Sequence, residues 1–104
     1  MNVYMYSNRT EDSYSATGEY KDGKLIVKQG SKIAKKLKEN FRPYANVVAI
    51  RTDAKYVDEN SITVRDIEFS SASAAAQFVS GRSTDGLLAW KIKRGVALRT
   101  IVKK

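Results

Sequence analysis

Residues 69–83 read FSSASAAAQFVSGRS and form the most distinctive stretch of the chain. Ser71 is a good helix N-cap, because its hydroxyl can accept a hydrogen bond from an otherwise unpaired backbone N–H one turn into the helix. The alanines that follow favour a helix, and Gly81 suits the left-handed residue that closes one. We therefore predict a helix over residues 72–80. A helix this short depends on tertiary packing, and its small side chains let another segment approach closely.

A β-hairpin is predicted upstream of this helix. Asp22-Gly23 is a typical two-residue hairpin turn, and it separates β-prone runs at residues 15–20 and 25–28. Gly18 inside the first run marks a bulge or a close approach by another element. The short run VYMY at residues 3–6 is bounded by polar residues and predicts an edge strand.

Further strands are predicted on both sides of the helix. Residues 62–69 are rich in β-branched side chains and read as a strand that leads into it. Downstream, Arg94-Gly95 lies between LLAWKIK at 87–93 and VALRTIVK at 96–103. This arrangement predicts a terminal hairpin.

Two more helices are predicted between the hairpin and the strand at residues 62–69. Ile33, Leu37 and Phe41 recur at four-residue spacing among lysines, which predicts a short basic amphipathic helix over residues 31–41. A second apolar pattern opens at a proline, which suits a first helical position, and predicts a helix over about residues 43–55.

Length and composition predict one domain over residues 1–104. The chain has 104 residues, of which 42% are hydrophobic and 29% charged, so it can bury one modest core. It has no internal repeat, linker or low-complexity tail. The expected fold class is α+β, a single small domain of antiparallel hairpins packed with two or three short helices.

The chain contains neither cysteine nor histidine. Disulfides, thiolate zinc sites, Ser–His and Cys–His nucleophile pairs and the usual neutral-pH base are therefore excluded. Glycine-rich phosphate loops are absent, and the aspartates do not reproduce a calcium loop. We expect no enzyme activity, no metal and no cofactor. No apolar run is long enough to span a membrane and the N-terminus does not read as a signal peptide, so a cytoplasmic protein is expected.

The net charge of +8 is unevenly distributed along the chain. Residues 21–51 carry nine Lys and Arg against two acids, and residues 70–104 carry seven against one. The segments at 1–20 and 52–69 are net acidic. If the two basic blocks fold onto one face, they form the electrostatic footprint of a polyanion binder. The alternative is a solvated basic surface that only aids solubility.

Candidate nucleic-acid contacts follow from the basic clusters and from the start of the predicted helix 72–80. Lysines and arginines would bind phosphates, and the helix start offers backbone N–H groups that suit an anion, although ordinary capping explains its serines equally well. Three aromatic residues, Tyr20, Tyr44 and Trp90, could stack bases, with a core position the expected role of Trp90. The candidate contacts are Lys28, Lys32, Lys35, Lys36, Lys38, Arg42, Ser71, Ser73, Arg82, Ser83, Lys91, Lys93 and Arg94.

The stretch FSSASAAAQFVSGRSTDGLLAWK at 69–91 resembles a domain of unknown function, DUF 4357. That family's signature looks like FSSPSAAA, an apolar pair, GRS, NGW and a short gap to WK. ATGEYKDGKLIVKQGSKIA at 16–34 is similar to its opening, so the resemblance covers about residues 14–100. Ala72 stands where the family usually has proline, and Leu87 where it has an aromatic residue.

The resemblance implies context more than chemistry. The family occurs C-terminally in GIY-YIG nuclease-like proteins and in restriction–modification-associated proteins, which implies an accessory module that helps a nuclease or methylase engage DNA. We therefore expect a non-catalytic module that binds nucleic acid through a basic surface, with DNA favoured over RNA. The alternative is a protein–protein interaction module in such an assembly, with no direct nucleic-acid contact.

Overall fold

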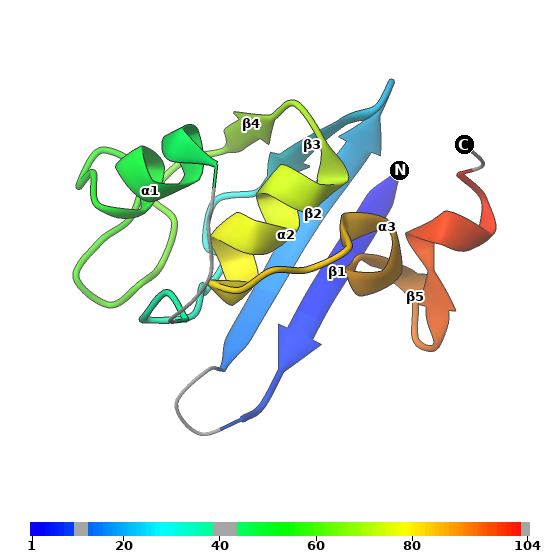
Figure 1. The fold of residues 1–104 in the computed structure, drawn as a ribbon, viewed down its shortest axis with the longest axis horizontal. Coiled ribbons are helices and arrows are strands. Elements are labelled where there is room, and N and C mark those ends of the chain that lie inside the picture. The colour runs from blue at the N-terminus through cyan, green and yellow to red at the C-terminus, as the bar shows by residue number, and fades with distance from the viewer. Residues whose placement is uncertain (10–12, 39–43, 103–104) are drawn as a thin grey trace.

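The computed structural model describes residues 1–9, 13–38 and 44–102, and all structural statements refer to these residues. They form a six-stranded antiparallel sheet in the order β4-β3-β2-β1-β5-β6, with helices packed on one face (Figure 1). The α+β fold class predicted from the sequence is confirmed. The elements are β1 (Asn2–Ser7), β2 (Tyr14–Lys21), β3 (Lys24–Val27), α1 (Ala45–Arg51), β4 (Ile67–Phe69), α2 (Ala72–Ser80), α3 (Gly86–Ala89), β5 (Lys91–Lys93), β6 (Val96–Ala97) and the 3₁₀ turn η1 (Leu98–Thr100).

The upstream hairpin is confirmed, but the position of β1 is not the predicted one. Asp22 and Gly23 have φ values of 53° and 80°, the left-handed pair that a two-residue turn between β2 and β3 requires. Strand β1 was predicted to be an edge strand and is internal instead. It pairs with β2 along its whole length and with β5 through Tyr4 and Lys91. Strand β5 of the C-terminal hairpin pairs with the side of β1 that would otherwise be the edge of the sheet.

The predicted basic helix over residues 31–41 is wrong for residues 31–38, which are not helical; Phe41 lies outside the described residues. Lys32 forms antiparallel bridges with Ser15 and Ile62. The N–H of Ala34 donates to the carbonyl of Val79, and the N–H of Lys38 donates to that of Gly81, each at 2.8 Å. The backbone N–H and C=O groups of the segment therefore form hydrogen bonds with these neighbours instead of with each other in a helix.

Helices α1 and α2 form where the sequence predicts helix. Helix α1 is shorter than the predicted 43–55, since it ends at Arg51; Pro43 lies outside the described residues. Helix α2 has the predicted bounds. The Ser71 hydroxyl accepts from the Ala74 N–H at 3.1 Å, and Gly81 closes the helix with φ 69°.

The segments that flank α2 contain less strand than predicted. Strand β4 is confined to Ile67–Phe69, whereas Ile62 and Thr63 make only isolated bridges. In the predicted terminal hairpin, β5 and β6 pair as expected around Gly95, but the leading residues form α3. The Asp85 side chain accepts the Leu87 N–H at 3.0 Å and so caps that helix.

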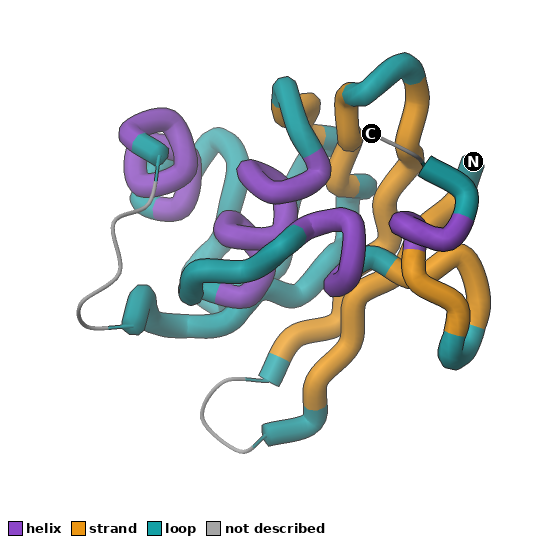
Figure 2. The backbone as a smooth tube through the Cα atoms, turned by 45° about the vertical axis from the view of Figure 1, so that its right-hand side comes forward, coloured by secondary structure: helices purple, strands orange, loops and turns teal. Residues whose placement is uncertain are grey.

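The core lies between the sheet and α2. In Figure 1, α2 and α3 lie in front of the strands, and in the turned view of Figure 2 both α1 and α2 lie on one side of them. Trp90 is fully buried, as expected, and its indole N–H donates to the Ala72 carbonyl at 3.2 Å. The Phe69 and Phe78 rings pack with centroids 5.1 Å apart.

Gly18 allows this close packing of strand and ring. A Cβ at Gly18 would lie 2.9 Å from a Leu25 methyl carbon and 3.3 Å from the Trp90 ring. The close approach predicted at this glycine is therefore confirmed. None of the described helices is long and apolar enough to cross a membrane.

Candidate nucleic-acid interface

The face of the sheet opposite α2, here called the open face, is lined by exposed side chains. Strand β1 alternates strictly, with Val3 and Met5 buried and Tyr4 and Tyr6 exposed over 44% and 71% of their surface. The strand pairing places Thr17 of β2 beside Tyr4 and Ser15 beside Tyr6, and both of these residues are exposed. Two tyrosine rings therefore stand on this face beside small hydroxyl side chains.

Three of the sequence-predicted cations also lie on the open face, and a fourth is exposed at its β5 edge. Lys91 is the cross-strand partner of Tyr4, and Lys32 is that of Ser15, so their side chains start from the face of the tyrosines. The Lys91 ammonium turns back to the carbonyl of Leu88 in α3. Lys28 extends the β2–β3 register, because its N–H donates to the Thr17 carbonyl at 2.8 Å. Lys93 is exposed next to Ile92, which packs against the core, at the point where the β5–β6 register is irregular. Residues far apart in the chain thus meet on one surface.

Charge on the open face is unequal between its two ends. On the β3–β4 side, the Lys28 ammonium lies 3.1 Å from the Asp66 carboxylate, and Lys24 lies 4.0 Å from Glu68. The backbone N–H of Gln29, followed by the Lys28 side chain, lowers the pKa of Asp66. The β3–β4 end is therefore neutralised by its acids. Among the described residues, the lysines of this face that have no acidic partner are Lys91 and Lys93 on β5 and Lys32, whereas β1 itself carries no charged side chain.

Lys32 and Lys91 make hydrogen bonds within the chain, but neither pairs with an acid in the part of the chain that the structure describes. The Lys32 ammonium donates to the Ser13 hydroxyl at 3.3 Å, and the Lys91 ammonium donates to the Leu88 carbonyl at 2.6 Å. Each ammonium carries three donors, so further hydrogen bonds to a phosphate remain available. Neither of these partners is an acid.

A second group of predicted cations lies beside the C-terminal end of α2. The hydrogen bonds from Ala34 to Val79 and from Lys38 to Gly81 hold the 34–38 segment against the end of this helix. Lys35 and Lys36 are exposed there, and Arg82 follows Gly81 directly. Figure 1 shows the β5 hairpin at the other end of the molecule. The structure therefore gathers the predicted cations into two groups, and Arg94 at the hairpin turn belongs to neither.

The predicted serines mostly have structural partners. The Ser71 hydroxyl caps α2, and the Ser73 hydroxyl accepts the Gly86 N–H at 3.2 Å, which ties α3 to the start of α2. Ser83 is exposed in the loop between these helices. Arg42 lies outside the described residues.

Sequence reasoning chose other aromatic residues than those the open face presents. Trp90 is buried, Tyr20 packs against the core, and Tyr44 is exposed at the start of α1. Tyr4 and Tyr6 were not among the candidates. The sequence shows that they alternate with Val3 and Met5. Because residues 3–6 were predicted only as an edge strand, the tyrosines were not expected to form part of an exposed sheet face.

Arg51 is a further residue whose role was not predicted from the sequence. Its guanidinium donates to the carbonyls of Phe78 and Ala34, and burial lowers its pKa to about 10. The sequence signal is the position of Arg51 on the apolar face of the predicted helix, because a charged side chain there needs hydrogen-bond partners inside the fold. Arg51 therefore joins α1, the end of α2 and the 34–38 segment.

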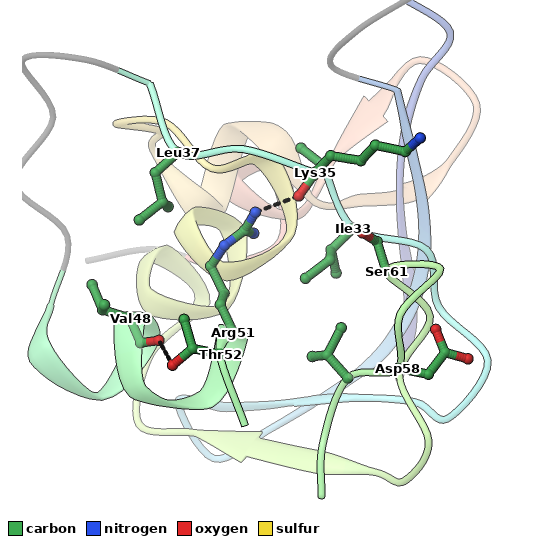
Figure 3. Close-up of a pocket in the computed structure, with 10 residues that line it drawn as sticks. Ile33, Lys35, Leu37, Val48, Arg51, Thr52, Asp58 and Ser61 are labelled. Carbon is green, nitrogen blue, oxygen red and sulfur yellow. Dashed lines mark hydrogen bonds between the residues drawn. The ribbon is translucent and has the colours of Figure 1, made fainter. Parts of the chain in front are cut away.

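A pocket of about 190 Å³ adjoins this junction. Figure 3 shows it between α1, the 33–37 segment and the loop that carries Asp58 and Ser61. Leu37 and Val48 line it, each exposed over 37% of its surface. Asp58 uses its carboxylate within the loop, where one oxygen accepts the Asn60 and Ile62 N–H groups. Within the described ranges, no group of three metal-ligating side chains occurs.

A basic α+β domain with one open sheet face is the class of protein that these observations define. Residues 5–102 match the family described as "Domain of unknown function (DUF4357)", and the chain belongs to this family. Searches of curated proteins and of solved structures find no match to the chain.

Proposed function

We propose that this domain is a non-catalytic accessory module that binds nucleic acid, with DNA favoured, through the phosphate backbone. The observation that supports this most directly is that strand pairing brings Lys32 and Lys91, which are far apart in the chain, to the two sides of the exposed tyrosines on one sheet. Each ammonium that contacts a phosphate releases condensed counterions, which favours binding at low salt. Lys35, Lys36 and Arg82 would add phosphate contacts at the second group.

The biological setting is proposed from the family. We place the module in the cytoplasm, in a nuclease or restriction–modification assembly in which a partner protein performs the chemistry. The chain's own role there is to hold the nucleic acid near that partner. The absence of cysteine and histidine fits this division of labour, because the chain itself lacks the most common neutral-pH catalytic side chains.

The test is a binding titration across salt. Fluorescence anisotropy of labelled single- and double-stranded DNA, between about 50 and 200 mM salt, should show affinity that falls with salt. Three to five phosphate contacts require a fall of roughly 20- to 130-fold for the single strand and roughly 40- to 500-fold for the duplex. Lys32→Gln and Lys91→Gln should each lower the slope of log affinity against log salt by about 1. Lys55→Gln, which makes the same charge change outside the sheet, is the matched control and should leave the slope unchanged. Absence of binding to either DNA at about 50 mM salt would overturn the proposal.

The second candidate function is protein–protein interaction. It is favoured by the pocket beside α1, where exposed Leu37 and Val48 could receive an apolar side chain of a partner. Leu37→Ser and Val48→Ser separate the two functions. They should weaken assembly with a nuclease or methylase partner without any change in the salt-dependent binding of DNA.

A further inference from the structure

We infer that the tyrosine face, defined as Tyr4, Tyr6, Lys32, Lys91 and Lys93, binds single-stranded nucleic acid by stacking unpaired bases on its two rings. This inference rests on the proposed function and makes it more specific, because it names the form of nucleic acid and the side chains that select it. Phosphate contacts alone accept a duplex as readily as a single strand, whereas ring stacking requires accessible base faces.

The two rings are free to receive a ligand. Tyr6 is exposed over 71% of its surface and Tyr4 over 44%, although a tyrosine ring gains free energy when it is buried. Their cross-strand neighbours on β2 are Ser15 and Thr17, whose small side chains leave the sides of the rings uncovered. Aromatic residues in such positions are sequence-tolerant stacking platforms, because every base has a flat π surface.

The spacing of the rings favours a single strand. Tyr4 and Tyr6 are two residues apart on one strand, so their Cα atoms are separated by roughly 6.8 Å along it. Successive bases in a B-form strand are about 3.4 Å apart, half that distance. Bases that stack one on each ring must therefore separate from each other. A flexible single strand can do this, whereas a duplex would have to break its stacking and pairing.

Cations flank the rings on both sides. Lys91 is directly opposite Tyr4 on β5, where cross-strand Cβ atoms lie about 4.5–5.5 Å apart. Lys32 lies beyond Ser15 on the other side of Tyr6. A strand whose bases cover the rings therefore has an ammonium group within reach of its phosphates on either side, and this charge complementarity identifies a polyanion as the occupant.

Acids mark the end of the tyrosine face. Glu19 lies opposite Asn2, two cross-strand pairs beyond Thr17 and next to it on the same face, and Glu68 lies further along at β4. Lys28 is engaged by Asp66, so that part of the sheet carries little net charge. The expected footprint runs from the β5 hairpin across β1 to Lys32 and does not extend to β4.

The experiment compares ring-removing and ring-retaining variants. The probes are a labelled oligothymidylate of about 20 nucleotides, which forms no stable pairing, and a duplex of the same length, at one low salt concentration. The wild-type chain should bind the single strand more tightly than the duplex. Tyr4→Leu/Tyr6→Leu should lose on the order of tenfold or more in single-strand affinity, whereas Tyr4→Phe/Tyr6→Phe should retain it.

Controls separate this inference from the proposed function. Tyr44→Leu removes an exposed ring outside the sheet and should leave binding unchanged, and thermal melting checks that each variant folds. If the duplex binds as tightly as the single strand, or if the double Leu variant binds like the wild type, the stacking inference is overturned while salt-dependent binding still supports the proposed function. If neither probe binds, both are overturned.

Discussion

Arg51 and the two exposed tyrosines show how single residues acquire roles that their local sequence does not state. The guanidinium of Arg51 reaches two carbonyls on segments 17 and 27 residues away in the chain, so its role exists only after α1, α2 and the 34–38 segment have come together. Tyr4 and Tyr6 are exposed because none of the described segments covers the face on which they stand. The alternating residues of one β-strand indicate that its side chains point to two opposite faces of a sheet. They do not indicate which of these faces the rest of the chain covers.

Replacing Arg51 by methionine should destabilise the fold. Arg51→Met keeps most of the apolar stem but leaves the Phe78 and Ala34 carbonyls without their donor, and a buried polar group without a partner costs about 1–3 kcal/mol. We expect the free energy of unfolding to fall by about 2 kcal/mol or more, as measured by urea denaturation. The control is Arg99→Met, because Arg99 makes only an exposed ion pair with Asp85 and its loss should cost about 0.5 kcal/mol or less. Equal losses for both variants would show that the buried contacts of Arg51 do not matter.

At the scale of elements, the predictions succeeded where local signals agreed and failed where distant segments decided. Helix α2 has its cap, its helix-forming alanines and its closing glycine within one short stretch, and its predicted bounds are confirmed. The 31–38 segment carries a helical spacing, but its backbone hydrogen bonds go to β2, to the 61–63 loop and to the end of α2. The leading part of the terminal hairpin became α3 because Asp85 caps a turn that ends at the buried Trp90.

The family signature accordingly describes how α2, α3 and Trp90 pack together. Ser71 caps α2, Ser73 accepts the Gly86 N–H, and the Trp90 indole donates to the Ala72 carbonyl. These contacts lie on the helical side of the sheet, whereas the tyrosine face lies on the other. The residues that make the family recognisable are therefore chiefly residues that hold the fold together.

Gly86→Ala should be severely destabilising for this reason. An added Cβ would collide with the backbone of Ala72 and Ser73, which cannot move away as a flexible side chain could. We expect a loss of about 3 kcal/mol or more in the free energy of unfolding. Gly23→Ala is the matched control, since Gly23 has open space around it and its φ of 80° should cost only about 1–2 kcal/mol of backbone strain. Chemical denaturation of both variants compares the two, and a Gly86→Ala loss no larger than the control's would contradict the packing argument.

At the scale of the whole molecule, the two sides of the sheet differ in what they contact. One side is covered by α2 and α3 and contains the core, and the other presents tyrosines and lysines to solvent. The sequence predicts the excess of positive charge and most of the cations involved, because composition and clustering are local properties. It does not predict their division into a sheet-face group and a group beside α2, since that division depends on the pairing of Lys32 with Ser15 and of Lys91 with Tyr4.

The most direct test of the central claim is a map of where nucleic acid touches the molecule. Backbone amide resonances of the isotope-labelled chain would be followed by NMR during titration with oligothymidylate at low salt. The account predicts that the largest shift changes fall on β1, on β5 and around Lys32, with small changes at β4 and α1. Changes concentrated on the helical side, with β1 and β5 undisturbed, would contradict it.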